Sequence, residues 1–214
     1  MEFISEIWNF IKELINPESI IHYGGFGLLL FVVYSETGLF VGFFLPGDSL
    51  LFTAGLFTAT GLIDLPVLVV SMSICFAAIA GNSTGYLFGR RAGKAIFKRE
   101  KSFFFKPSHL KHAKEFYDKH GGKAIVLGVF LPIIRTFAPI VAGAVELKFK
   151  KFIFYSISGA MLWSNSLVLT AYFLGKNIPG IKDYLHYIII SLVVITSVPF
   201  LIAIFKNWKS KKSR

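Results

Sequence analysis

The sequence predicts an all-α polytopic membrane protein, and three observations lead to that fold class. Hydrophobic residues make up 54% of the 214 positions and charged residues 16%, whereas soluble domains carry about 25% charged residues. Several stretches contain no Asp, Glu, Lys or Arg over about the 20 residues that a membrane-spanning helix needs. Lys and Arg are concentrated in blocks beside these stretches, which is typical of the cytoplasmic loops of membrane proteins.

Composition and charge also exclude other classes of protein. A disordered chain is poor in apolar residues, whereas this chain has a mean hydropathy of +0.64. A disulfide scaffold is excluded because Cys75 is the single cysteine. The net charge of +11 would suggest nucleic-acid binding in a soluble protein. No aromatic-interleaved basic face or nucleic-acid-binding motif accompanies the charge, so we expect no nucleic-acid partner.

The first third of the chain is expected to hold an interfacial helix and a broken apolar region. Apolar residues recur at helical spacing within residues 1–18 with acidic residues off that face, which suits a helix lying in the membrane interface. Residues 19–63 are mainly apolar but are interrupted by Glu36, Pro46–Gly47 and Asp48. Non-helical backbone at membrane depth must be enclosed by protein or line a wet cavity. We therefore expect a re-entrant hairpin there, or a short span joined to one.

The middle of the chain is expected to cross the membrane once and then form a basic loop. Residues 65–89 contain no Asp, Glu, Lys or Arg, which predicts a transmembrane helix. Residues 90–123 contain eleven Lys or Arg and three acidic residues, which predicts a cytoplasmic loop. His109–His120 within this loop is a second amphipathic stretch that suits the interface.

The last third is expected to contain a second hairpin and two further spans. Residues 124–145 are interrupted by prolines, and a proline inside a helix removes a hydrogen bond and clashes with the preceding turn. Residues 152–175 and 184–205 are the expected spans, and residues 206–214 are a basic tail. If 124–145 enters and leaves on the cytoplasmic side, the basic cluster at 146–151 and the tail share that side with the 90–123 loop. A full span at 124–145 would instead place both this cluster and the tail on the side opposite the 90–123 loop.

An internal repeat accompanies this order of elements. Thr84–Arg90 (TGYLFGR) matches Thr170–Lys176 (TAYFLGK) at an offset of 86. Gly24-Gly25 corresponds to Gly121-Gly122, and Phe44-x-Pro46 with Ala54-Gly55 corresponds to Phe137-x-Pro139 with Ala142-Gly143. The first span would run inward and the second outward, so the repeat is inverted. Inverted repeats with broken helices are typical of transporters that bind substrate near the membrane midplane.

Three ionisable residues within the apolar segments are the candidate functional groups: Glu36, Asp48 and Arg135. On insertion scales, placing one charged side chain at the centre of a membrane-spanning helix costs about 2.5–3.5 kcal/mol. The carboxylates could instead reach an interface or cap a half-helix, with Asp48 as the N-cap after Pro46-Gly47. Arg135 could form a structural ion pair with one of them.

The functional interpretation is that Arg135 binds an anionic lipid headgroup, because a guanidinium fork suits a phosphate. Pro46, Gly47 and Pro139 are the further candidate substrate-binding residues. Glu36 and Asp48 would bind protons or cations that couple or gate transport. A buried carboxylate can act as a proton carrier.

Other polar groups have simpler interpretations. Asn82 and Asn165 are expected to form hydrogen bonds between helices, Cys75 to pack as a small apolar residue, and Arg90 and Arg91 to anchor the end of a span. The sequence contains no phosphate-binding glycine loop, metal motif or nucleophile elbow. We therefore expect no enzyme activity, no cofactor and no metal.

Three segments together resemble the signatures of the DedA family, and the similarity extends over about residues 20–205. The first comprises Glu36-Thr37-Gly38, Phe44–Asp48 (FLPGD) and Ala54-Gly55, the second is Gly81–Gly93 (GNSTGYLFGRRAG), and the third is Phe130–Gly143 (FLPIIRTFAPIVAG). The resemblance implies a single membrane domain over residues 1–214 with two opposed re-entrant hairpins, located in the bacterial inner membrane. It also implies the movement of lipids between leaflets, notably undecaprenyl phosphate. The acidic pair of the family falls on Glu36 and Asp48, and its second arginine on Arg135.

The sequence departs from the family pattern at three positions. Val129 stands where the family usually has an arginine, Asn82 where an aspartate is common, and Val41 where a proline is frequent. The missing arginine removes one positive charge from the expected phosphate site. Looser lipid scrambling therefore remains an alternative to specificity for a polyprenyl phosphate.

The first hypothesis is a translocase for a phosphate-bearing lipid, with undecaprenyl phosphate as its first candidate, coupled to a proton or sodium gradient. The alternatives are an uncoupled phospholipid transporter or scramblase, with phosphatidylethanolamine as one candidate, and a non-transporting membrane assembly factor. The translocase requires a cavity that holds Arg135 with a carboxylate, and the assembly factor predicts that the three ionisable residues pair with one another. The expected partners are the bilayer, an anionic headgroup, protons or sodium ions, and a second copy of the chain in a homo-oligomer. The C-terminus is expected in the cytoplasm.

Overall fold

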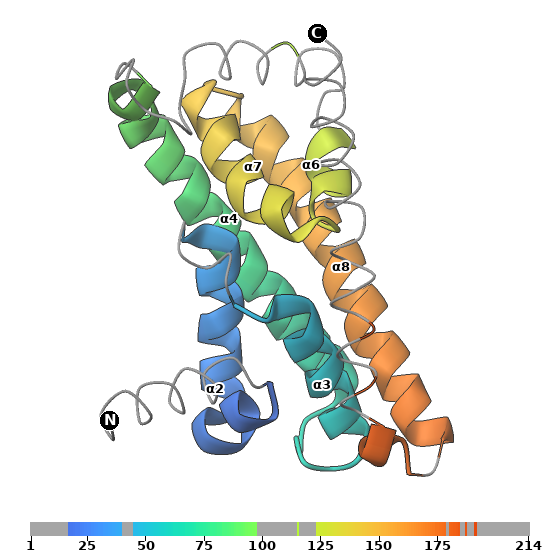
Figure 1. Cartoon of the computed structure of the whole chain (residues 1–214). Coiled ribbons are helices and arrows are strands. Elements are labelled where there is room, and N and C mark those ends of the chain that lie inside the picture. The colour runs from blue at the N-terminus through green and yellow to red at the C-terminus, as the bar shows by residue number, and fades with distance from the viewer. Residues whose placement is uncertain are drawn as a thin grey trace, which may run out of the picture.

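Two long helices, α4 (Val67–Phe97) and α8 (Phe149–Asn177), pack against one another and extend along most of the molecule (Figure 1). They are the helices, within the described part of the chain, that are long and apolar enough to cross a membrane. The 25-residue apolar part of α4 is about 37 Å long and the 29 residues of α8 about 43 Å, against a hydrocarbon core of about 30 Å. The spans predicted at 65–89 and 152–175 are thereby confirmed as helices of spanning length.

The computed structural model describes residues 17–39, 45–97, 123–178 and 180–184, together with Glu115, Tyr187 and Ser191. These residues contain helices and no strand, which confirms the all-α fold class. Four predicted elements lie wholly or almost wholly outside them: the interfacial helix within 1–18, the stretch His109–His120, the span at 184–205 and the tail at 206–214.

Two short helices pack against the long ones. They are α3 (Gly47–Ala59) and α7 (Pro132–Ala144), each of 13 residues or about 20 Å, which is too short to cross a bilayer. Both begin near the middle of the molecule and run toward opposite ends (Figure 1). The most extensive packing of α3 is with α8, and that of α7 is with α4.

Glycines allow the backbones of these helix pairs to approach closely. A side chain at Gly55 of α3 would collide with the carbonyl oxygen of Val168 in α8. On the other side, a side chain at Gly143 of α7 would collide with the carbonyl oxygen of Tyr86 in α4. Small residues at helix contacts are a common feature of membrane proteins, because close backbone approach increases van der Waals contact.

Both short helices end in the same way. Each final turn closes with a pair of hydrogen bonds typical of a Schellman motif, from Gly61 and Leu62 in α3 and from Glu146 and Leu147 in α7. The residue in the left-handed region is Gly61 (φ 76°) in α3 and Glu146 (φ 57°) in α7. Measured from their first residues, the two helices are related by an offset of 85, close to the 86 of the sequence repeat.

The N-terminal helix α2 (Pro17–Gly38) packs against α4 and is broken at Gly25, whose φ of 61° is not helical. Near its C-terminus the backbones of Gly38 and Gly81 approach so closely that a side chain at either would collide with the other helix. The hydroxyl of Thr37 donates to the carbonyl oxygen of Ala78 at 3.4 Å. The region predicted as broken at 19–63 is therefore two helices, α2 and α3, with residues 40–44 between them outside the description.

Residues 124–145 also form two helices, but only one of the two prolines, Pro132, lies at the break between them. The helix α6 (Lys123–Gly128) ends before a short turn, and Pro132 is the first residue of α7. Pro139 lies inside α7 and does not end the helix, which corrects the expectation that both prolines break the segment. Pro139 is buried and lies beside Gly85 of α4. The proposed correspondence of Pro46 with Pro139 is therefore wrong, because Pro46 precedes α3 whereas Pro139 lies inside α7.

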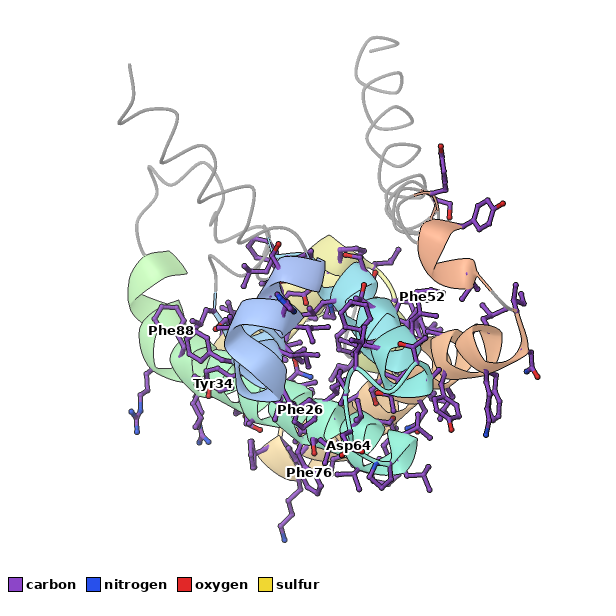
Figure 2. The ribbon with its side chains drawn as sticks, turned by 90° about the horizontal axis from the view of Figure 1, so that it is seen from below. Phe26, Tyr34, Phe52, Asp64, Phe76 and Phe88 are labelled. Atoms are coloured by element: carbon purple, nitrogen blue, oxygen red, sulfur yellow. The ribbon has the colours of Figure 1, made fainter. Side chains whose placement is uncertain are left out.

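Polar side chains join the two long helices across the core. The amide of Asn82 donates to the Ser156 hydroxyl at 3.0 Å, and the Ser71 hydroxyl donates to the Asn165 carbonyl oxygen at 2.9 Å. This confirms the expected role of both asparagines. Outside the core, large apolar side chains are exposed along the long helices; Phe76 of α4 is 71% exposed and lies at the periphery of the view in Figure 2. Such a surface suits contact with lipid tails.

Candidate functional site

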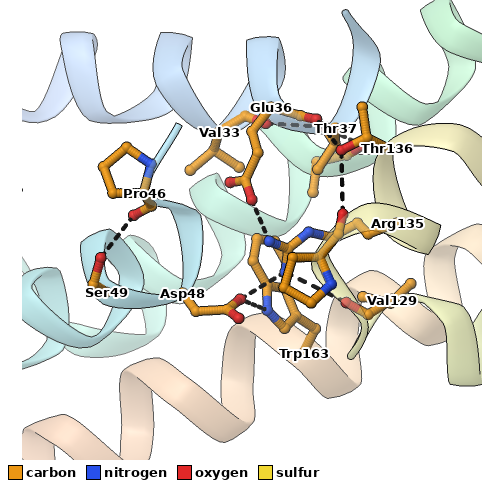
Figure 3. Close-up of polar contacts among 12 residues, drawn as sticks. Val33, Glu36, Thr37, Pro46, Asp48, Ser49, Val129, Arg135, Thr136 and Trp163 are labelled. Carbon is orange, nitrogen blue, oxygen red and sulfur yellow. Dashed lines mark hydrogen bonds and ion pairs between the residues drawn. The ribbon is translucent and has the colours of Figure 1, made fainter. Parts of the chain in front are cut away.

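The site is built around Arg135, which lies in the first turn of α7 and is 2% exposed. Pro132 begins this helix, as is common at first helical positions because the missing N–H costs nothing there. The site lies where the N-termini of α3 and α7 meet near the middle of the molecule (Figures 1 and 3). A buried guanidinium requires partners for its charge and its N–H groups.

Two carboxylates on different helices bind this one guanidinium. Glu36 lies in the last turn of α2, and its Oε1 accepts a hydrogen bond from Arg135 Nη2 in a buried ion pair. Asp48 lies in the first turn of α3, and its Oδ1 accepts from Arg135 Nη1 at 2.6 Å. Figure 3 shows the arginine between the two acids. The structure thus brings together three residues that are 12 and 87 positions apart in the chain.

The alternative roles considered for the carboxylates do not match their positions. The N-cap of α3 is Pro46, and no side chain forms a capping hydrogen bond, so the expectation of Asp48 as an N-cap is wrong. Its carboxylate is committed to Arg135 instead. Glu36 is 2% exposed and therefore does not reach a water-facing interface.

The other predicted site residues take different places. A side chain at Gly47 would overlap the Glu36 carboxylate, so the absence of a Cβ makes room for that acid beside α3. Pro46 accepts a hydrogen bond from the Ser49 hydroxyl at 3.1 Å in the same turn. Pro139 lies one turn beyond Arg135, and its described contact is with Gly85 in the interface between α7 and α4.

Three further groups complete the surroundings of Arg135. The indole Nε1 of Trp163 in α8 donates to Asp48 Oδ1 at 2.8 Å, and the indole ring lies 4.2 Å from the guanidinium carbon. The Thr136 hydroxyl donates to the backbone carbonyl oxygen of Glu36 at 3.1 Å. The carbonyl oxygen of Val129 accepts from Arg135 Nη1 at 3.4 Å, while the Val129 side chain packs in the apolar core. The sequence interpretation had not identified Trp163 or Thr136.

A signal for Trp163 was nevertheless present in the sequence. Tryptophans of membrane proteins are concentrated at the two interfaces, whereas Trp163 stands at the centre of the predicted span 152–175. An indole N–H at such depth needs a hydrogen-bond acceptor. A tryptophan at mid-span therefore indicates a buried polar partner on another helix.

The charges of the cluster are not balanced. Glu36 and Arg135 are the fully buried charged side chains of the described residues, and Asp48 is 13% exposed. With both acids ionised, the three side chains carry a net charge of −1. The second carboxylate oxygen of Glu36 and the Nε of Arg135 are buried without a hydrogen-bond partner. A single proton or monovalent cation would neutralise the cluster. Across the described residues, no group of three His, Cys, Asp or Glu is suited to hold a metal ion.

Comparison with known proteins places these features in a family. Residues 45–173 match the VTT domain. The chain is 37% identical over 207 residues to the protein DedA of Escherichia coli (strain K12), covering 97% of this chain and 93% of that protein. It is 38% identical over 197 residues to an uncharacterized membrane protein of Mycobacterium leprae (strain TN), covering 92% and 87%. It is 31% identical over 166 residues to the inner membrane protein YqjA of Escherichia coli (strain K12), covering 77% and 73%. No solved structure matches the chain.

Proposed function

The chain belongs to the VTT domain family of DedA-like membrane proteins, and from that premise we propose that it moves a phosphate-bearing lipid between the leaflets of a bilayer. Undecaprenyl phosphate is the first candidate substrate, and the lipid bilayer and an anionic headgroup are the partners. Arg135 is the residue that would hold the headgroup, and Glu36 and Asp48 would bind the coupling proton or sodium ion.

The single observation that supports this proposal most is the sharing of Arg135 between two carboxylates deep in the molecule. A guanidinium presents a planar fork that fits a phosphate as well as a carboxylate. A phosphate can therefore replace one or both acids on the same guanidinium. The pairing with the acids is then the resting state of a headgroup site.

The placement of the short helices adds to this electrostatic fit. A helix N-terminus carries a partial positive charge, and Asp48 and Arg135, which form a hydrogen bond, lie in the first turns of α3 and α7. Half-helices whose N-termini point at an anionic substrate group are a recurring device of transporters. Arg135 and these two N-termini together favour an anion at this position.

We also propose that α2–α4 and α6–α8 are the two halves of an inverted repeat, each with a re-entrant hairpin. The equal lengths and matching ends of α3 and α7 support this, as does the packing of each short helix on the long helix of the other half. Rocking of one half against the other would open the site alternately to each side.

The orientation that we propose places the basic segments of the chain in the cytoplasm of a bacterium, at its inner membrane. The backbone of Gly143 at the end of α7 lies against the backbone nitrogen of Arg90 near the end of α4. Lys148, Lys150 and Lys151 follow α7 closely and are exposed, as is Arg90. Their location at one end supports a common side for the 90–123 loop and the 146–151 cluster.

Coupling to an ion gradient is supported by the unbalanced charge of the cluster. A proton or a sodium ion that binds with the two carboxylates would neutralise it and loosen their hold on Arg135. The phosphate could then bind in their place. A passive scramblase needs no such exchange and is the first alternative.

A non-transporting assembly factor is a second candidate, and one observation favours it: Glu36, Asp48 and Arg135 pair with one another, as a structural role predicts. In that case the cluster serves to hold α2, α3 and α7 together. Transport measurements separate this candidate from the first.

The experiment is reconstitution of the full chain in proteoliposomes with a fluorescent polyprenyl phosphate or phospholipid in one leaflet. We expect protein-dependent transfer of the phosphate-bearing lipid, and slower transfer by Arg135→Ala. The matched control is Arg90→Ala, which removes an exposed arginine outside the cluster. Equal transfer by empty liposomes and by the folded wild-type protein would contradict transport and favour the assembly factor.

A further inference from the structure

Trp163 touches the charged cluster in two ways and is the largest of the fully buried side chains described. It lies at the midpoint of α8, which runs from Phe149 to Asn177. The guanidinium carbon of Arg135 lies over the Trp163 ring, and the indole N–H donates to the Asp48 carboxylate. Figure 3 shows the indole approaching the cluster from α8, on the side away from Glu36.

The important feature is that one oxygen serves two donors. Asp48 Oδ1 accepts from Arg135 Nη1 at 2.6 Å and from Trp163 Nε1 at 2.8 Å. If the bond to Arg135 is lost, the carboxylate keeps a hydrogen bond from the indole. A buried carboxylate with no donor would be far more costly, because its desolvation would be uncompensated.

This matters for the exchange of partners on Arg135. A lipid phosphate can bind Nη1 only if Asp48 releases it. Because Trp163 belongs to α8 rather than to α7, it does not depend on Arg135 for its position. It can therefore retain Asp48 while the guanidinium turns to the phosphate.

We propose that Trp163 is a positioning residue of the headgroup site, whose indole N–H holds the Asp48 carboxylate after a lipid phosphate has displaced it from Arg135. This inference rests on the proposed function of Arg135. The ring contributes separately, because a cation above an indole face is favoured. The edge of the guanidinium, which carries the N–H groups, remains for the phosphate.

The substitution that isolates the N–H is Trp163→Phe, which keeps an aromatic ring but has no donor. Loss of a hydrogen bond to a charged group raises the KM for the phosphate-bearing lipid by about tenfold. The maximal rate changes by less than about twofold, because the bond is needed in the bound state and not for its later movement. In an Asp48→Asn background the same substitution raises KM by about threefold or less, because a neutral amide loses less free energy than a carboxylate when its hydrogen-bond donor is removed.

The matched control is Tyr86→Phe. This substitution also deletes one donor from a fully buried aromatic ring, because the Tyr86 hydroxyl binds the carbonyl oxygen of Leu147 at the interface of α4 with α7. It should lower thermal stability and leave KM unchanged. If Trp163→Phe changes only stability, as Tyr86→Phe does, then Trp163 is structural and the proposal is wrong.

A second measurement does not require transport. Trp8 and Trp208 are the other tryptophans of the chain, so Trp8→Phe with Trp208→Phe leaves Trp163 as the single emitter. Purified protein in detergent is titrated with dihexanoyl phosphatidic acid, and with dihexanoylglycerol as the phosphate-free control. We expect a saturable change of Trp163 emission with the phosphatidic acid only. For Trp163→Phe, about tenfold more of the same ligand should be needed to raise the transition temperature by the same amount.

The outcomes distinguish this inference from the proposed function. A saturable emission change without lipid transfer in proteoliposomes would contradict transport and still support Trp163 as part of a phosphate site. Lipid transfer without any emission change would leave transport intact and overturn the role of Trp163. Absence of both would contradict both proposals.

Discussion

At Arg135, loss of the planar fork and loss of the positive charge have different expected consequences. Arg135→Lys keeps the charge, but an ammonium cannot bind two carboxylates in the way the fork does, so transport should fall while the protein still folds. Arg135→Ala should impair transport further. It also leaves two buried acids without a cation, which costs about 3–5 kcal/mol of stability for a broken buried pair.

Lipid transfer in proteoliposomes and thermal unfolding in detergent measure the two effects. Adding Glu36→Gln to Arg135→Ala removes one of the unpaired charges and should recover part of the lost stability. If both Arg135 variants transfer lipid at the wild-type rate, Arg135 is a structural ion pair and the headgroup binds elsewhere.

Single residues were predictable from the sequence where the free-energy cost of burying the side chain does not depend on its neighbours. An ionisable side chain within an apolar segment is costly whatever its neighbours, so Glu36, Asp48 and Arg135 could be identified without the structure. Their pairing with one another was only one of the alternatives, because contact between residues 36 and 135 depends on how three helices meet. Thr136 was missed for the same reason: its hydroxyl is one of many in the chain until the Glu36 carbonyl lies opposite it.

Among the elements, the long helices were predictable and the short ones only in part. The uncharged stretches 65–89 and 152–175 agree within three residues with the apolar spans Val67–Arg91 and Phe149–Asn177, although α4 continues to Phe97. The starts of α3 and α7 follow from Pro46-Gly47 and Pro132, because proline is favoured at or just before a helix start. The continuity of α7 through Pro139 was not predictable, because a proline inside a helix usually kinks or ends it.

The contact of α7 with α4 should be sensitive to a single methyl group. In Gly143→Ala the new Cβ would overlap the carbonyl oxygen of Tyr86, and the backbone of α4 cannot easily move. Overpacking of this kind costs about 1–3 kcal/mol. The control is Gly27→Ala in α2, where a Cβ meets nothing within 4 Å and alanine is the better helix former.

Thermal unfolding of the two variants in the same detergent measures the difference. We expect a lower transition temperature for Gly143→Ala and an unchanged or slightly higher one for Gly27→Ala. Equal transition temperatures would show that the α4–α7 contact is looser than the structure indicates.

For the whole molecule, the proposed orientation predicts opposite sides for two positions. A reporter fused after Arg214 should be cytoplasmic, and a cysteine introduced as Pro179→Cys should react with a membrane-impermeant maleimide from outside. The neighbouring residues Ile178 and Gly180 are exposed, so reagent can reach this end of α8. The native Cys75 is buried and is replaced by alanine for the measurement. Reaction of both positions from the same side would contradict the arrangement of spans and hairpins.

The last prediction also concerns the whole molecule, because it separates coupled transport from passive scrambling. One guanidinium and two carboxylates leave an uncompensated negative charge when both acids are ionised, and a low-dielectric site disfavours such an imbalance. A coupled carrier would use this imbalance to bind a proton or sodium ion, and only the neutral cluster would release Arg135 to the phosphate. Transfer of lipid should then rise with an imposed proton or sodium gradient. Glu36→Gln and Asp48→Asn keep the shape of each side chain but cannot ionise, so each should remove the dependence on the gradient. Asp64→Asn makes the same chemical change at an exposed position before α4 and should leave the dependence on the gradient unchanged. Wild-type transfer that is indifferent to both gradients would contradict coupling, and the uncoupled scramblase would then be the better account of this cluster.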